Sequence, residues 1–189
     1  GKSAVMVEVN SETDFVAKDA NFADFANAVG EAALACAVAD VDGLIAQPIR
    51  VGEATTIAEA REALVAKIGE NVQLRRLVRF DKAQGLLHSY RHGVRIGVLV
   101  EMEGGDAELG KDVAMHIAAS NPLCVSADQV PAEALEKEKE IFRAQALESG
   151  KPADVVDKII GGRVRKYLEE VTLLGQAFVK DADLTMEKL

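Results

Sequence analysis

The sequence contains no tryptophan, and aromatic residues make up only 4% of its 189 residues. It therefore offers few platforms on which single-stranded bases can stack, and its formal charge of −9 opposes long-range attraction to phosphate backbones. No apolar run reaches the roughly 18 residues that a membrane-spanning helix needs, and the first residues lack a signal-peptide pattern. We expect a cytoplasmic protein that binds neither nucleic acid directly nor a membrane.

Cysteine is also scarce. Cys36 and Cys124 lie far apart, without the Cys-x-x-Cys or Cys/His spacing of a zinc site or the pattern of a disulfide framework. They are predicted to be small buried apolar residues. Neither Gly-Gly pair is flanked by the Gly-Lys-Ser/Thr pattern of a phosphate loop, and no Ser/His/Asp or Cys/His spacing indicates nucleophilic catalysis. The sequence thus predicts no cofactor, no metal site and no enzyme; His116, mid-helix, is expected to be a packed histidine.

Strand-like alternation is present in the first half. Residues 4–10, 72–80 and 94–102 alternate apolar and polar side chains, the period of a half-buried strand. In 72–80 the alternation predicts Val72, Leu74, Val78 and Phe80 on one face. Residues 86–90 can form a further strand, with 91–93 turning the chain back as a hairpin. An antiparallel meander that includes residues 4–10 is predicted.

Helical spacing occupies much of the rest. Residues 21–37 and 106–120 have apolar positions at helical intervals. Thr56 and Glu59 form a capping box before a third helix, and Gly69 suits the position just after its end. Between these helices, residues 40–54 show no sustained periodicity and are interpreted as a surface loop.

The second half ends in two further apolar stripes, over residues 132–149 and 152–171, separated by 150–152. A glycine and a proline at that separation favour a tight turn between helices. The predicted fold is α+β, with subdomains 1–105 and 106–189 of antiparallel sheet packed with helices. An antiparallel helical hairpin (coiled coil) of about residues 132–171 is expected to protrude from the second.

One segment, residues 8–18, is more specific than the rest. Its strand stops at polar residues and places Asp14 and Phe15 side by side. By periodicity alone, Phe15 shares a helical face with Phe22 and would be a core residue, while Asp14 would be a carboxylate favoured at a helix start.

The type and order of residues in 8–18 resemble the signature segment of the elongation factor Ts family. Further segments look like that family in the same order: 66–71 followed by Arg75 and Arg76, 89–93, 95–100, 115–122, 150–152 and 175–179. These matches cover nearly the whole chain. The resemblance also implies that the family's N-terminal helical module and a segment after the helical hairpin fall outside these residues, which bears on full exchange activity.

The resemblance implies a guanine nucleotide exchange factor that promotes GDP release from elongation factor Tu. Asp14 and Phe15 would approach the magnesium side of the partner's nucleotide pocket, with Phe15 inserted between partner side chains. Ile68, Gly69 and His92 match positions of the same contact surface. In the second subdomain, Val179 resembles a position that touches another domain of the partner. A homodimer is left open.

Other interpretations of these residues are open at this stage. His92 can be a turn residue that tolerates unusual backbone angles, and Val179 a strand core residue. Asp14 and His92 can be an acid–base pair of an enzyme, although no substrate-binding motif accompanies them. A structural interaction module, assembled through the helical hairpin without exchange activity, is a third hypothesis.

Overall fold

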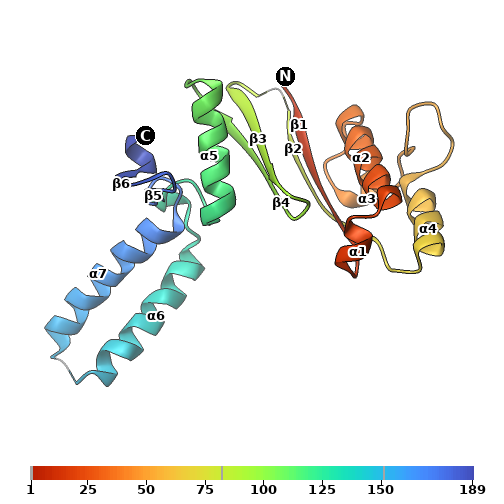
Figure 1. Ribbon diagram of the computed structural model, residues 1–189. Helices are drawn as coiled ribbons and strands as arrows, with labels where there is room; N and C mark the ends of the chain where they lie inside the picture. The colour runs from red at the N-terminus through yellow and green to blue at the C-terminus, as the bar shows by residue number, and fades with distance from the viewer. Residues whose placement is uncertain (1, 82, 151) are drawn as a thin grey trace. The chain divides into compact units, whose positions relative to one another are not determined.

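The computed structural model describes residues 2–81, 83–150 and 152–189, and it confirms an α+β fold. The chain divides into two compact units, residues 1–114 and 115–189 (Figure 1). The boundary falls inside α5 (Ala107–Ser120), whereas the sequence places it just before this helix. The extent of the functional domains therefore stays a prediction.

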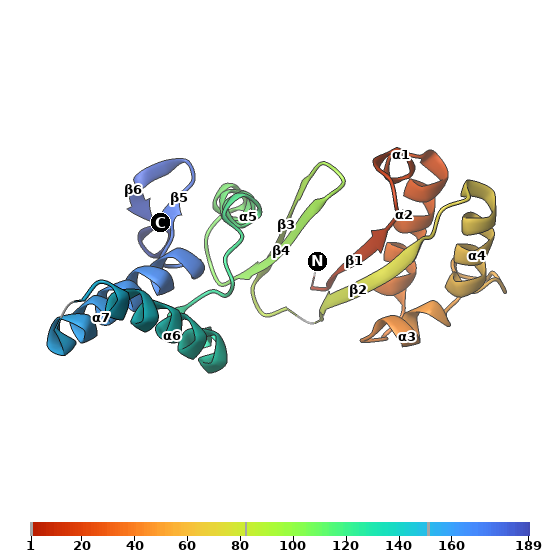
Figure 2. The same ribbon diagram turned by 90° about the horizontal axis from the view of Figure 1, so that it is seen from below.

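The first unit is built on a strand pair with helices on one side (Figures 1 and 2). Its core is formed by side chains of the pair and of four helices, with Val29, Leu44 and Val72 fully buried. The elements around this core are β1 (Ala4–Asn10), α1 (Asp14–Ala17), α2 (Ala20–Ala35), α3 (Val41–Ile45), α4 (Ile57–Ile68) and β2 (Gln73–Phe80).

Strand β2 contains a β-bulge opposite β1. Glu8 pairs with Arg76, but the next residue of β1, Val9, pairs with Leu74, so Arg75 is an extra residue in β2. An extra residue reverses the alternation of the strand beyond it, because successive side chains point to opposite faces.

The bulge makes part of the face prediction for β2 wrong. Val72 and Leu74 are buried as predicted, but beyond the bulge it is Leu77 that packs on the core. Val78 is 46% exposed, and it does not share the buried face of Leu74.

A second strand pair, β3 (Leu86–His92) and β4 (Ile96–Met102), forms its own sheet. The predicted single meander is therefore wrong. The connection after β2 bonds instead to the chain ahead of β1, where the Ala83 amide donates to the Lys2 carbonyl at 2.8 Å. The turn between β3 and β4 is residues 93–95, so His92 ends a strand rather than lying in the turn; Gly93 has the positive φ, 60°, that a turn glycine allows.

The helix ends of the first unit agree with their capping residues. The capping box of Thr56 and Glu59 is present at the start of α4, and Gly69 ends the helix at φ 80°. Helix α2 starts after Asp19, whose side chain accepts amide hydrogen bonds, and it ends at Ala35 rather than residue 37.

The predicted surface loop over residues 40–54 is partly wrong. It contains α3, capped by Asp40, whose carboxylate accepts the Gly43 amide at 2.7 Å. Leu44 is 0% exposed and Ile49 is 6% exposed, so the segment contributes to the core. A helix of five residues is too short to show a periodicity in the sequence.

In the second unit, α6 (Ala132–Glu148) and α7 (Ala153–Val171) run side by side (Figures 1 and 2). They pack through a small apolar cluster centred on Ala146, Val156 and Ile160. In the predicted turn between them Gly150 has φ 66°, and Lys151 lies outside the described residues. The unit is completed by β5 (Ala177–Phe178), β6 (Asp181–Thr185) and 3₁₀ turns at Ala127–Gln129 and Met186–Lys188.

The two cysteines are free and only partly buried, so the predicted burial is incomplete for both. Cys36 follows α2 and packs at the margin of the core of the first unit. Cys124 lies in the second unit, where its thiol donates weakly to the Ser126 carbonyl at 3.3 Å.

The carboxylate of Glu8 makes the stability of the first unit pH-dependent. A hydrogen bond from Arg76 is the main cause that lowers the pKa of Glu8 from 4.5 to about 2; burial opposes it, and bonds from Asn10 and Arg75 assist. Because the folded pKa is depressed, this stabilisation is complete above pH 4.5 and is lost as pH falls toward 2. We expect Glu8→Gln to remove about 1 kcal/mol of it, a value reduced for solvent screening of a surface pair.

Urea unfolding at pH 6 and pH 2.5 measures this contribution. The wild type should lose more unfolding free energy over this interval than Glu8→Gln, while Glu53→Gln, in the exposed Arg50 pair, serves as the control. Equal losses in the wild type and Glu8→Gln would contradict the assignment.

Candidate functional site

The residues 13–17, which we call the Phe15 turn, present an aromatic side chain to solvent. Thr13 caps α1, and its hydroxyl accepts the Val16 amide at 3.4 Å. Val16 is 8% exposed and faces the core, whereas Phe15 is 88% exposed. The interpretation of Phe15 as a core residue that shares a face with Phe22 is wrong, since Phe22 alone is buried.

The Phe15 turn is bonded to the segment that follows α4. Both oxygens of Glu70 accept from Thr13, one from its amide at 3.0 Å and the other from its hydroxyl at 2.7 Å. In the opposite direction, the Asn71 amide donates to Glu12 at 3.1 Å. These bonds place Ile68 and Gly69, at the end of α4, beside the Phe15 turn.

The β3–β4 hairpin also reaches the Phe15 turn. Arg95 in the hairpin turn forms an ion pair with Asp14, and both side chains are largely exposed. His92 is the last residue of β3, just before the same turn, and its Nδ1 lies 3.3 Å from the Tyr90 hydroxyl. The sequence-predicted residues of the first unit, Asp14, Phe15, Ile68, Gly69 and His92, thus come from three segments that the structure brings together; we call them the Phe15 surface.

The arrangement does not favour an acid–base pair. The Asp14 carboxylate is engaged by Arg95, and the Nδ1 of His92 lies within hydrogen-bond distance of the Tyr90 hydroxyl. A general base needs its proton-accepting atom directed toward a substrate position. The exposed face instead offers an apolar side chain and a glycine backbone, which are typical of a protein contact surface.

Sequence reasoning did not single out Glu12, Glu70 or Arg95, the residues that hold the Phe15 surface together. Their partners lie 57 to 81 residues away, and side-chain bonds at that separation leave no local pattern. All three do fall inside segments that carry the family resemblance: Glu12 in 8–18, Glu70 in 66–71 and Arg95 in 95–100. That position is the one signal in the sequence that pointed toward them.

Val179, the predicted site residue of the second unit, is 49% exposed just after β5. Its amide donates to Nδ1 of His116 at 3.1 Å. Because Nδ1 accepts this bond, Nε2 carries the proton and donates to the Gln176 side-chain oxygen at 2.9 Å. His116 is 0% exposed, which confirms that it is a packed histidine.

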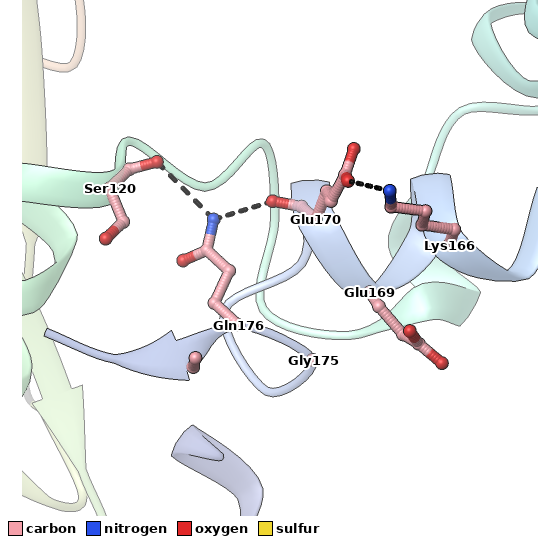
Figure 3. A pocket seen from close by; sticks show the side chains of 7 residues that line it. Ser120, Lys166, Glu169, Glu170, Gly175 and Gln176 are labelled. Atoms are coloured by element: carbon pink, nitrogen blue, oxygen red, sulfur yellow. Dashed lines mark hydrogen bonds and ion pairs between the residues drawn. The ribbon is translucent and has the colours of Figure 1, made fainter. Parts of the chain in front are cut away.

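Gln176 connects the end of α5 to the end of α7. Its side-chain nitrogen donates to the Glu170 carbonyl at 2.8 Å and to the Ser120 carbonyl at 3.4 Å (Figure 3). Gly175 lies so close to α7 that a Cβ atom there would stand 2.7 Å from Glu169 Cα. The residues of segment 175–179 therefore have structural roles. Gly175 allows the close approach to α7, the Gln176 side-chain amide bridges two helices, and the Phe178 ring is buried.

A hollow of about 410 Å³ lies beside this bridge, lined by residues that include Gly175, Gln176 and Glu169 (Figure 3). Its Lys166 and Glu170 pair with each other at 3.7 Å. The Gln176 side chain bonds to His116, Ser120 and Glu170. The polar groups here therefore stabilise the unit and do not form a ligand site.

The described residues, 2–81, 83–150 and 152–189, contain neither a cluster suited to a metal ion nor a helix suited to a membrane. Within these ranges no three His, Cys, Asp or Glu side chains gather as a metal ion would require. Over the same part of the chain, every helix is too short or too polar to cross a bilayer.

Comparison with known proteins leads to the same family as the sequence segments. A model of the family described as "Elongation factor TS" matches residues 12–189. The elongation factor Ts of Thioalkalivibrio sulfidiphilus is 60% identical over 187 residues, which are 98% of this chain and 63% of that protein. That of Methylococcus capsulatus is 56% identical over 189 residues, 100% of this chain and 64% of the relative. This chain, which spans under two thirds of the length of these relatives, belongs to the elongation factor Ts family.

Proposed function

We propose that this chain binds elongation factor Tu in the cytoplasm and promotes GDP release from it, as a nucleotide exchange factor in translation elongation. The observation that carries this proposal is the exposure of Phe15, at 88%, on a turn bonded at both sides to other segments. An exposed phenylalanine in a fixed position is suited to insertion into a partner.

The rate acceleration expected of an exchange factor requires a contact surface rather than a single residue. An exchange factor must bind the nucleotide-free or distorted partner more tightly than the nucleotide-bound one. Accelerating release about ten-thousand-fold requires roughly 5.5 kcal/mol from the barrier. Burying one phenylalanine contributes about 1.5–3 kcal/mol, so the other members of the Phe15 surface have to contribute as well.

In the proposed mechanism, Phe15 enters between partner side chains on the magnesium side of the nucleotide pocket. Ile68, Gly69 and His92 contact the partner around it. Displacing the elements that hold Mg²⁺ weakens the phosphate contacts that the metal had been neutralising. Val179, fixed through its amide by His116, contacts another domain of the partner and keeps the factor in register.

The paired helices α6 and α7 form the family's coiled-coil extension in this proposal. Leu147 is 59% exposed near their connecting end, which also suits a surface for assembly. An interaction module without exchange activity is therefore the second candidate function.

Mixing the chain with elongation factor Tu loaded with fluorescent GDP tests both candidates. We expect substoichiometric amounts of the chain to accelerate loss of fluorescence in stopped flow, because an exchange factor turns over. Binding without accelerated release would favour the interaction module. If the chain neither binds elongation factor Tu nor accelerates GDP release, the result would contradict both candidates for this chain.

A further inference from the structure

We propose that Glu70 is a positioning residue for Phe15: it holds the Phe15 turn in the orientation that enters the partner. This inference deepens the proposed function and rests on it. Glu70 does not belong to the Phe15 surface, and its carboxylate acts only through Thr13, two residues before Phe15.

The geometry of Glu70 is that of a two-point attachment. Its oxygens accept the Thr13 amide at 3.0 Å and the Thr13 hydroxyl at 2.7 Å, so the carboxylate fixes both the backbone and the side chain of the residue that caps α1. Hydrogen bonds to an ionised acceptor are shorter and stronger than those between neutral groups.

A second bond runs in the opposite direction between the same segments. Glu12 accepts the Asn71 amide at 3.1 Å, so each segment contributes one carboxylate to the backbone of the other. Gly69 precedes this pair with φ 80°, a conformation that turns the chain after α4 and brings Glu70 to the Phe15 turn. Two opposed bonds restrict sliding of the segments more than one bond would.

The Phe15 turn depends on this attachment in addition to the burial of Val16 and the Asp14–Arg95 ion pair. Helix α1 has four residues, far fewer than an isolated helix needs for stability. Phe15 itself, 88% exposed, gains little packing from its own chain. Without Glu70 the turn would have to become ordered when the partner binds. The conformational entropy lost in that step would weaken association.

The chain contains a matched control for this chemistry. Glu59 also accepts both the amide and the hydroxyl of one threonine, Thr56, at 2.8 Å and 3.0 Å. It does so at the start of α4, the end opposite Gly69. Glu59→Ala therefore removes bonds of the same type at the far end of α4, without touching the Phe15 turn.

The test measures the stimulated release of fluorescent GDP as a function of chain concentration, at temperatures where each variant is folded by circular dichroism. Glu70→Ala should lower the initial slope about fivefold, chiefly by raising the concentration for half-maximal effect. Glu70→Gln keeps one acceptor oxygen and should recover part of this loss. Glu59→Ala should lower the melting temperature but leave the slope unchanged.

A double-mutant cycle separates positioning from a general structural role. If Glu70 acts through Phe15, adding Glu70→Ala to Phe15→Ala should change the slope by less than a factor of two. A wild-type slope for Glu70→Ala, or the same fivefold loss with and without Phe15, would overturn the proposal while leaving the exchange function standing. Absence of stimulation by the unsubstituted chain would instead reject the proposed function.

Discussion

Replacing Phe15 by alanine should slow stimulated GDP release from elongation factor Tu by about ten- to a hundred-fold. The reason is the lost burial of one aromatic side chain, about 1.5–3 kcal/mol, which the proposed mechanism places in the partner at the exchange step. Stopped-flow release of fluorescent GDP at saturating chain concentration measures this rate directly.

In Phe15→Ala, an effect on exchange can be distinguished from an effect on folding stability. Phe15 is 88% exposed in the free chain, so its removal should leave the melting temperature unchanged. Val51, 91% exposed in the segment between α3 and α4, provides the control, and Val51→Ala should release GDP at the wild-type rate. A wild-type rate for Phe15→Ala would rule out insertion of this side chain as a step in exchange.

The exposure of Phe15 shows that helical periodicity predicts a shared face only within one continuous helix. Phe15 and Phe22 are seven residues apart, which in one continuous helix would place them on the same face. The structure has two helices instead, since α1 ends at Ala17 and α2 begins at Ala20 after a new cap at Asp19. The break resets the helical phase, and the two rings are free to face opposite ways.

Elements whose signal is local were predicted well. The capping box and terminal glycine of α4 need only neighbouring residues, and the structure has both. The same is true of β1, where Val5, Val7 and Val9 pack against the core as the alternation predicts. The face of β2 beyond Arg75 was not predictable, because a bulge is a property of the strand pair rather than of either strand. The attachment of the Phe15 turn through Glu70 was missed for the same reason: both partners have to be folded before the bond exists.

The burial of Leu44 in the segment 40–54 was not predicted from the sequence, and it leads to a prediction about stability. Gly43, Pro48 and Gly52 interrupt any pattern there, which favoured a surface loop, yet Leu44 is 0% exposed within the core of the first unit. Burial of a side chain depends on what packs over it, and the sequence around Leu44 does not show that. Truncating it would leave a cavity among close-packed neighbours.

We therefore expect Leu44→Ala to lower the unfolding free energy of the first unit by about 3 kcal/mol, within the range of roughly 2–5 typical of such truncations. Urea denaturation followed by circular dichroism measures this change at constant m-value. Val51→Ala lies in the same segment but at 91% exposure, and it should stay within about 0.5 kcal/mol of the wild type. If both substitutions had the same small effect, α3 would be a surface attachment; a large difference between them would make α3 part of the core on which α2 and α4 are packed.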